Sequence, residues 1–396
     1  MLDSFRRLKK IILRLKGLAE VGTANVIGTA ILSVFWLFIA SLLGTEGYGE
    51  VSYFIAIANI ASVIAFLGAG KTLTVYIAKQ VKIQAPIFLI SITSSLVISI
   101  VLFVILSRVE ISLYVIGYVI FGLVTHDLLG LKLYKNYSKY LITQRILMVV
   151  LALAFFYLIG LQGIILGYAI AFFPYSFTLY KRFKEAKIDF SVVKSRLGFM
   201  MNIYGQDLSK ILSRSIDKLI IFPIFGFAIL GNYQLGFQVL MVLSILPLIV
   251  FQYVLPREAI GYSNKKLKVV TVVFSVILAI LASLLSPVVF PILFPEFTEA
   301  VKIIQIMSFA IIPITVSFMY NSKFLAREKS RYVIIGSMIF LSIQISGIVI
   351  LGEIYGIIGI AFSTVLGAIS EAAFLTGINH LKKDDYKFGT KKSSFV

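Results

Sequence analysis

Five ionisable side chains lie within one otherwise apolar stretch of the chain. They are Asp207, Lys210, Arg214, Asp217 and Lys218. All five share one stripe of an α-helix, because their positions are spaced by the three to four places at which neighbours recur on a helix face. Arginine can hold an oxyanion through two parallel hydrogen bonds, whereas lysine acts as a compact point charge. The excess of three cations over two carboxylates predicts a site for an anionic group.

The same stripe also allows a purely structural interpretation. Asp207 could pair with Lys210, and Asp217 could pair with Arg214 or Lys218, so that the pairs only hold the helix in a bundle. Ionisable groups are expensive in hydrocarbon and normally face a bundle interior or a watery cavity. Both interpretations therefore predict that this face is turned away from lipid.

Two residues elsewhere extend the candidate site. Lys71 follows a long apolar run and is predicted to line the mouth of the cavity. Asn25 lies with Gly22 and Thr29 on a small, polar helix stripe. Such a stripe is more typical of a helix-packing face than of a binding site. Packing is the preferred interpretation of Asn25, and substrate contact is the alternative.

Glu371 is a carboxylate in another apolar run. It could exchange a proton or bind Na⁺, since an apolar setting raises the pKa of a carboxylate, or it could pair with a cation of the ionisable stripe. The sequence leaves both roles open. His126 and Asp127 could form a proton relay or a metal-ligand pair, but a solvated helix end is the favoured interpretation. With no cysteine and two histidines, the sequence predicts no metal site and no catalytic residues.

The composition determines the setting of these residues. Of the 396 residues, 59% are hydrophobic and 14% are charged, whereas soluble domains have about 45–50% apolar and about 25% charged residues. A soluble enzyme is therefore excluded. Spans of roughly 20 residues allow about a dozen membrane-crossing helices and no sizeable soluble domain. Apolar runs predict twelve spans: 18–43, 49–70, 84–106, 111–130, 143–160, 163–180, 199–225, 232–255, 268–293, 301–322, 332–351 and 356–379.

The distribution of positive charge predicts the topology. Of the 37 lysines and arginines, 32 lie at the termini and in alternate loops, and the loops between them hold only Arg108 and Lys302. Because basic loops stay on the cytoplasmic side, both termini are expected in the cytoplasm. The net charge of +19 is then a topology signal, and no nucleic-acid partner is expected. An all-α polytopic protein of the cell (plasma) membrane follows, with about 12 transmembrane helices.

The predicted organisation has five parts. They are a basic amphipathic interfacial helix (1–17), an N-terminal six-helix bundle (18–180), a cytoplasmic linker (181–198), a C-terminal six-helix bundle (199–379) and a cytoplasmic tail (380–396).

Three landmarks recur along the chain and indicate an internal repeat. They are turns at Tyr48 and Tyr233, basic connectors ending at Tyr140 and Tyr332, and the glycines Gly163 and Gly356, at offsets of 185, 192 and 193. Each pair falls at the same place in a six-helix half and on the same side of the membrane. The spacing predicts two parallel six-helix repeats, an arrangement found in transporters.

With these residues in view, the chain resembles the polysaccharide-export branch of the MOP (multidrug, oligosaccharidyl-lipid, polysaccharide) exporter superfamily, which contains the O-antigen-type flippases. The likeness covers nearly the whole chain and begins with its basic amphipathic start. The residues that carry it further are Leu43-Gly44 with Tyr48-Gly49, Arg214-Ser215-Ile216-Asp217-Lys218, Gly231-Asn232-Tyr233, Asn321 through Arg331, and Tyr355-Gly356-Ile357-Ile358-Gly359.

The resemblance implies a MATE-like, V-shaped pair of bundles with alternating access. It implies a flippase that moves a polyprenyl-(pyro)phosphate-linked oligosaccharide from the cytoplasmic to the outer leaflet. Lys210, Arg214 and Lys218 would then bind the phosphate. The three carboxylates would either bind the coupling ion, Na⁺ or H⁺, or form structural ion pairs; they are Asp207, Asp217 and Glu371. Membrane lipids and glycan-assembly enzymes are the expected partners.

Two rival functions follow from the same residues. A Na⁺- or H⁺-coupled drug or metabolite exporter of the superfamily would rely on acidic groups, and the net cationic stripe speaks against it. A membrane glycan polymerase or ligase usually carries a large outward loop. The longest outward loops expected here are only about Phe294–Ala300 and Gly226–Gly231.

Overall fold

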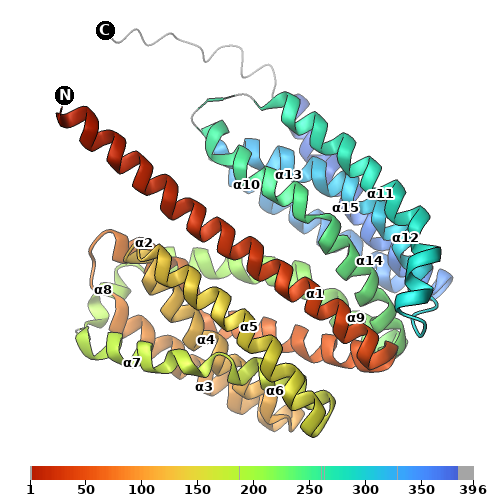
Figure 1. Cartoon of the computed structure of the whole chain (residues 1–396), viewed down its shortest axis with the longest axis horizontal. Helices are drawn as coiled ribbons and strands as arrows, with labels where there is room; N and C mark the ends of the chain where they lie inside the picture. The colour runs from red at the N-terminus through yellow and green to blue at the C-terminus, as the bar shows by residue number, and fades with distance from the viewer. Residues whose placement is uncertain (1, 187, 260, 263, 328, 382–396) are drawn as a thin grey trace. The chain divides into compact units, whose positions relative to one another are not determined.

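The computed structural model describes residues 2–186, 188–259, 261–262, 264–327 and 329–381, and over these ranges the chain is helical with short connections (Figure 1). Ten helices in the described part are long and apolar enough to cross a membrane. The chain divides into two compact units. Unit 1 comprises Met1–Ile39 and Glu50–Leu219, and unit 2 comprises Ala40–Gly49 and Ile220–Val396.

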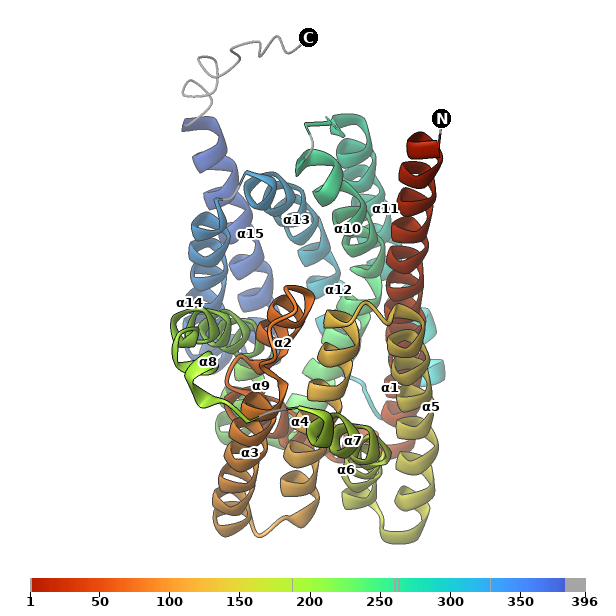
Figure 2. The same cartoon turned by 90° about the vertical axis from the view of Figure 1, so that its left-hand side faces the viewer.

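Unit 1 is built around one buried helix. α4 is mostly buried and packs against α2, α3 and α6, whereas only a small part of α3 and of α5 is fully buried. Figure 2 shows α3, α4, α5 and α6 running alongside one another. The elements of this unit lie at α1 (Leu2–Phe66), α2 (Ala69–Ala78), α3 (Gln84–Leu106), α4 (Val109–Gly130), α5 (Tyr134–Ile159), α6 (Leu161–Ile170), η1 (Phe173–Tyr175), α7 (Ser176–Glu185), α8 (Phe190–Lys194) and the first half of α9 (Leu197–Leu243).

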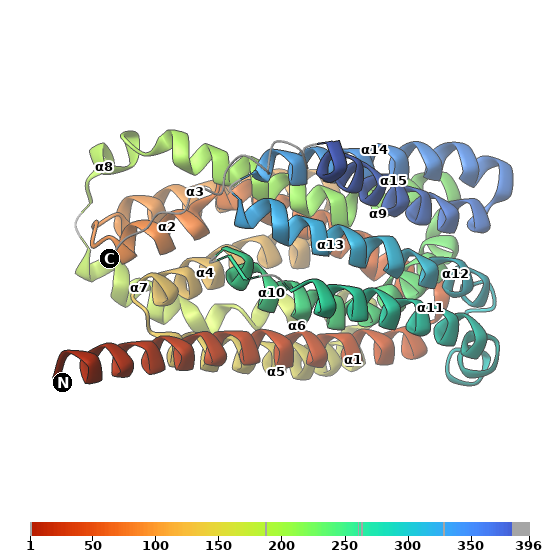
Figure 3. The ribbon, with the colours of Figure 1, turned by 90° about the horizontal axis from the view of Figure 1, so that it is seen from above.

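Unit 2 has the same helix-bundle character. α14 and α15 form its closest helix pair, and α13 packs against both α10 and α15. Figure 3 shows α10, α11 and α13 alongside one another. Besides the second half of α9, its elements lie at α10 (Ile245–Ala259), α11 (Lys265–Leu293), α12 (Ala300–Met307), η2 (Ser308–Ala310), α13 (Ile311–Ala326), α14 (Ser330–Tyr355) and α15 (Ile357–Leu381).

The twelve predicted spans correspond to ten long helices because two of the helices contain a bend. Glu20–Phe66 and Leu197–Leu243 are each 47 residues long. Gly44 interrupts the first with φ 66° and ψ −173°, and Gly226 interrupts the second with φ 83° and ψ 176°. Only glycine adopts this conformation readily. Each bend lies at the junction of two predicted spans, so the polytopic all-α prediction is confirmed.

The two bends pack directly on each other within unit 2. A Cβ atom on Gly49 would overlap the carbonyl oxygen of Phe227, and one on Gly231 would overlap that of Thr45. Backbone thus meets backbone, which a larger residue at either glycine would prevent. This contact explains why residues 40–49 belong to unit 2 although the rest of α1 belongs to unit 1.

Matching features recur in the two halves of the chain, at offsets slightly different from the predicted ones. The bends at Gly44 and Gly226 have an offset of 182 in sequence number, rather than 185. α5 and α14 are both 26 residues long. Each ends at a glycine with positive φ, Gly160 and Gly356, at an offset of 196 rather than 193. The predicted offsets are measured between Tyr48 and Tyr233 and between Gly163 and Gly356. The structural offsets are measured between the glycines at the bends and at the helix ends.

The predicted ends of the chain are described only in part. The interfacial segment 1–17 is helical from Leu2 and continues into the first span without a break. Its side chains, and the tail from residue 382, lie outside the described residues. The linker 181–198 contains the end of α7 and the short helix α8.

Candidate functional site

The start of α2 and the first half of α9 pack closely in unit 1. Gly68 precedes α2 with φ 72°, and a Cβ atom there would overlap the backbone of α9 at Met200. Farther along, the rings of Tyr76 and Phe199 make an edge contact with centroids 5.5 Å apart. The guanidinium of Arg196 lies 5.0 Å from the Tyr76 centroid. These contacts bring Lys71 on α2 to the ionisable stripe of α9.

Lys71 and Asp207 form an ion pair between helices that are distant in sequence. Their side chains keep 39% and 27% of their surface exposed, so a ligand could still reach either group. The predicted alternative, in which Asp207 pairs with Lys210, is not what the structure contains. Two residues singled out separately from the sequence are therefore brought together, by packing between helices that the sequence does not reveal.

Lys210 and Arg214 lie one turn apart on α9, and both are exposed. Among the described residues, the side chain of neither one forms an ion pair or a hydrogen bond. Together with the Lys71–Asp207 pair, they make a patch of three cations and one carboxylate. We call Lys71, Asp207, Lys210 and Arg214 the α9 cationic patch. It has the charge that the sequence predicts for an anion site.

Asp217 and Lys218 are different, because both are buried. Their exposed fractions are 1% and 7%. Lys218 Nζ lies 3.2 and 3.3 Å from the two carboxylate oxygens of Asp217, and it donates a 3.0 Å hydrogen bond to the carbonyl oxygen of Arg214. The structure therefore contains the Asp217–Lys218 pair that the structural interpretation of the stripe predicts. Lys218 is buried, unlike the exposed cations of the α9 cationic patch.

Asn25 is exposed on α1, but its amide is used within its own helix. Its Nδ2 donates to the carbonyl oxygen of Val21 at 2.8 Å, and Thr29 Oγ1 donates to the carbonyl oxygen of Asn25 at 2.8 Å. One turn farther on, Gly28 faces Arg145 of α5, with 3.3 Å between its Cβ position and Arg145 Cγ. Gly28 is not a member of the predicted stripe, whose residues Asn25 and Thr29 are exposed, so the role of Asn25 stays a prediction.

Arg145 is a residue whose setting the sequence does not reveal. The charge count groups it with the cytoplasmic-side cations near the start of the predicted span 143–160, whereas in the structure it lies well inside α5 and is half-buried. Its Nη1 atom lies 3.5 Å from the sulfur of Met148, and it forms no ion pair among the described residues. The glycine opposite it on α1 is the only sequence signal, and that signal is recognisable only once the two helices are known to be neighbours.

The favoured interpretation of His126 and Asp127 as a solvated helix end is wrong. Asp127 is 1% exposed and pairs with Arg182 of α7 at 3.3 Å. The ring of His126 lies 3.0 Å, at Nδ1, from the hydroxyl of Thr74 on α2. The two residues join α4 to α2 and α7, because this end of α4 is covered by its neighbours. Among the described residues, no group of three or more histidines or carboxylates could hold a metal ion.

Glu371 lies on α15 in unit 2 and is partly buried. Its Cγ atom is 3.3 Å from the Cβ position of Gly336 on α14, and the side chain of Asn321 on α13 approaches its carboxyl group. In the described part of the chain it forms no ion pair. An amide and a carboxylate together offer oxygen atoms suited to a hard cation.

Comparisons with known proteins identify solved structures that share this fold. No protein-family model matches the chain, and no curated protein matches it. A multidrug resistance MATE family transporter of the MOP superfamily, in an inward-facing conformation, matches with a TM-score of 0.74 and 12% identity over 94% of this chain and 99% of its own. The lipid II flippase MurJ, in an inward closed conformation, matches with a TM-score of 0.71 and 14% identity over 89% and 87%.

A third solved structure has the same fold. A MOP superfamily transporter from Pyrococcus furiosus, for which reverse polarity of the binding pocket suggests a different function, has a TM-score of 0.62 and 13% identity over 93% of this chain and 95% of its own. All three are transporters, and at such low identities the likeness concerns the fold. The chain is therefore a multi-pass membrane protein with the fold of the MOP transporter superfamily.

Proposed function

We propose that this protein is a flippase that moves a polyprenyl-(pyro)phosphate-linked oligosaccharide from the cytoplasmic to the outer leaflet by alternating access. The observation that carries the proposal is the pair of exposed, unpartnered cations Lys210 and Arg214 beside the Lys71–Asp207 ion pair, within the part of the chain that the structure describes. Cations in an apolar helix are expensive unless they have a function or a partner. A substrate phosphate would supply the partner that the described residues lack.

The chemistry of each residue suits a phosphate group. Arg214 would hold two phosphate oxygens with parallel hydrogen bonds, and Lys210, one turn away, would add a point charge. Lys71 could join them by exchanging its bond to Asp207 for a bond to the phosphate. Asp207 would then act as an internal competitor that reclaims Lys71 and favours release of the lipid head.

The energy source of the cycle is the second part of the proposal. Glu371 is a carboxylate in unit 2 that lacks an ion-pair partner in the described structure, and Asn321 lies next to it. It would exchange H⁺ or bind Na⁺ and so couple transport to an ion gradient. We place the basic face and both termini in the cytoplasm, as the distribution of lysine and arginine favours. Glycan-assembly enzymes would then supply the substrate and consume the product.

A second candidate is an ion-coupled exporter of drugs or metabolites. Its support is the likeness to a multidrug resistance MATE transporter, whose TM-score of 0.74 is as high as that of MurJ at 0.71. A site for cationic drugs would need a carboxylate excess. The α9 cationic patch has three cations to one carboxylate, so the flippase is preferred.

The test is movement of a fluorescent polyprenyl-pyrophosphate-linked sugar across proteoliposome membranes, under imposed Na⁺ or H⁺ gradients. Arg214→Ala should slow movement at least tenfold. Lys302→Ala serves as the matched control, because Lys302 is an exposed cation of unit 2. Normal movement in Arg214→Ala would refute the role of the patch. A wild-type protein that moves cationic dyes but no polyprenyl-linked sugar would establish the exporter instead.

A further inference from the structure

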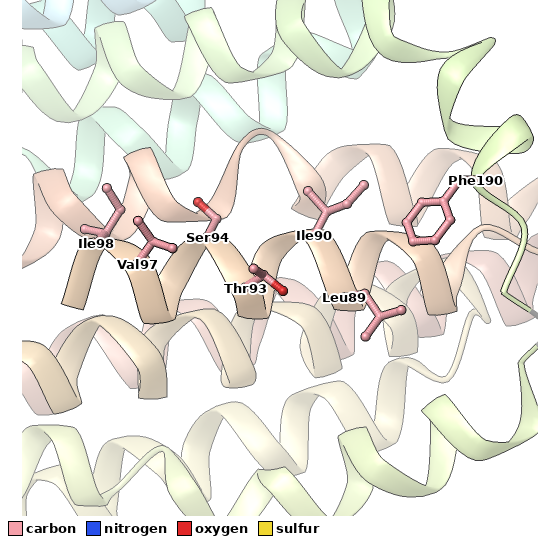
Figure 4. A pocket seen from close by; sticks show the side chains of 7 residues that line it. All are labelled: Leu89, Ile90, Thr93, Ser94, Val97, Ile98 and Phe190. Carbon is pink, nitrogen blue, oxygen red and sulfur yellow. The ribbon is translucent and has the colours of Figure 1, made fainter. Parts of the chain in front are cut away.

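A shallow apolar groove of about 440 Å³ follows the outer face of α3 in unit 1 (Figure 4). One aromatic ring from α8 lies at its end, and the remaining lining comes from α3. The lining residues are Leu89, Ile90, Thr93, Ser94, Val97, Ile98 and Phe190. Its volume lies within the range of small-molecule sites, about 300–1,000 Å³.

The sequence of α3 explains why this face is left open by the described residues of unit 1. Ser91, Ser95 and Ser99 recur every four residues and are all buried. Ser99 and Ser112 of α4 exchange hydrogen bonds between hydroxyl and carbonyl groups at 2.9 and 2.8 Å. Small residues thus bring α3 close to α4, and the apolar side chains are turned outward, where Val97 is 54% exposed.

The length of the groove matches one leaflet of a bilayer. From Leu89 to Ile98 the helix advances nine residues, or roughly 13.5 Å at about 1.5 Å per residue. The hydrocarbon core of a membrane is about 30 Å thick, so each leaflet supplies roughly half of that. An acyl chain of a phospholipid fits this length, whereas a long polyprenyl chain would extend well beyond it.

Two exposed cations lie close in sequence to the end of the groove at which α3 begins. Lys82 precedes α3 by two residues, and Lys194 lies one helical turn after Phe190 on α8. Both are exposed, and neither has an ion pair or a side-chain hydrogen bond in the part of the chain that the structure describes. A headgroup phosphate would supply the partner that both lysines lack in the described part of the chain.

The nearest carboxylate in the sequence is already engaged. Asp189 caps α8, where its Oδ1 atom accepts hydrogen bonds from the hydroxyl of Ser191 at 2.6 Å and from its backbone N–H at 3.0 Å. These bonds hold the pKa of Asp189 below its usual value, so it stays ionised as a cap. Asp127, which approaches Gln84 at the start of α3, is paired with Arg182, so Lys82 and Lys194 leave the balance at this end of the groove positive.

We propose that this groove binds one anionic phospholipid of the leaflet that borders the basic face. One acyl chain lies along α3 against Phe190, and the headgroup phosphate contacts Lys82 and Lys194. The bound lipid is a resident of the protein surface and differs from the transported lipid, whose phosphate is assigned to the α9 cationic patch. The site is complete within unit 1.

The test is native mass spectrometry of the full-length protein with phosphatidylglycerol or phosphatidylcholine of identical acyl chains. Wild type should retain one phosphatidylglycerol at least tenfold better than phosphatidylcholine. Thr93→Phe with Val97→Phe fills the groove and should reduce phosphatidylglycerol retention at least tenfold. Ile100→Phe is the matched control, because Ile100 lies on the same helix, is 63% exposed and does not line the groove.

The headgroup is tested separately. Lys82→Gln with Lys194→Gln should remove the preference for phosphatidylglycerol, whereas Lys139→Gln, an exposed cation of α5, should not. Phosphatidylglycerol with a photoreactive acyl chain, applied to unmodified protein, should label peptides from 84–106. Equal retention of both phospholipids, labelling elsewhere, or better retention of polyprenyl phosphate than of phosphatidylglycerol would overturn the proposal.

Discussion

Two groups of charges, one in each unit, show opposite ways of placing a lysine in a membrane protein. In unit 2, Lys268 is 16% exposed in its side chain and lies 2.7 Å from Glu258. It also donates to the carbonyl oxygen of Met319 at 2.7 Å, while Glu258 accepts a 2.8 Å bond from Ser322. In unit 1, Lys210 and Arg214 are exposed and make no such bonds among the described residues.

The difference separates charges that are bonded within the protein, which we call structural, from charges that are free to bind a ligand, which we call available. The Glu258–Lys268 pair has its hydrogen-bonding capacity met by the protein, so its loss should damage the fold. The α9 cationic patch leaves its donors for something else, so its loss should damage binding. Four experiments test this division, beginning with the largest expected effect.

Asp217→Ala should lower the free energy of unfolding by about 3–5 kcal/mol, because it leaves the buried Lys218 ammonium without its carboxylate. Detergent-solubilised protein, unfolded by heat or by SDS, gives the measurement. Adding Lys218→Met should recover much of the loss, since an apolar side chain needs no partner. Glu185→Ala is the control, because that side chain is 69% exposed. If the Asp217→Ala protein is as stable as wild type, the Asp217–Lys218 pair does not stabilise the fold and belongs with the available charges.

Lys210→Ala combined with Arg214→Ala should reduce movement of the polyprenyl-linked sugar roughly a hundredfold. Each charged hydrogen bond contributes about 1.5–3 kcal/mol, and about 1.4 kcal/mol corresponds to a tenfold effect. Stability should change by less than about 0.5 kcal/mol, because neither side chain has a partner to lose. Lys139→Ala with Lys302→Ala removes the same charge from elsewhere. If the double variant loses stability but still transports the sugar, Lys210 and Arg214 are structural charges, and the division between structural and available charges is wrong.

Glu258→Gln should have the reverse pattern. Removing the carboxylate charge weakens its bond to Lys268 and should lower the free energy of unfolding by about 1–3 kcal/mol. The transport rate per folded molecule should remain within twofold of wild type. A tenfold slower rate with unchanged stability would mean that the unit 2 pair also takes part in transport.

Asp207→Asn should have the smallest effect on stability, about 0.2–1 kcal/mol, because its ion pair with Lys71 is partly exposed. Its informative readout is binding. With the internal competitor neutralised, a soluble polyprenyl pyrophosphate of short chain length should bind several-fold more tightly, as measured by calorimetry. Weaker binding would indicate that Asp207 orients Lys71 instead of competing for it.

Much of the architecture is predictable from the sequence because lipid imposes simple rules. A run of about 20 apolar residues is read as a span, and charges in it must share a face. The stripe of α9 and the recurring landmarks of the two halves follow from spacing alone. The predicted offset between the two halves differs slightly from the structural one. The sequence pairs Tyr48 with Tyr233, whereas the bends lie at Gly44 and Gly226.

The partners of the site residues cannot be predicted in the same way. Helical periodicity says which residues share a face but not which helix that face meets. Lys71 and Asp207 lie on segments far apart in sequence, and only the packing of α2 on α9 joins them. For the same reason the sequence does not reveal that α1 covers Arg145, and it places Asp127 in solvent although α7 covers it.

The contact between the two bends has a consequence for biosynthesis. Residues 40–49 leave the ribosome well before the segment near Gly231, yet Gly49 packs against that segment. At about 5–20 residues per second, the first bend waits roughly 10–40 s for its partner. During that time its glycine backbone is open to other helices, so insertion factors that shield it would matter most then. Halves of the chain expressed alone should be unstable, and unit 2 should form only when the amino-terminal segment is supplied with it.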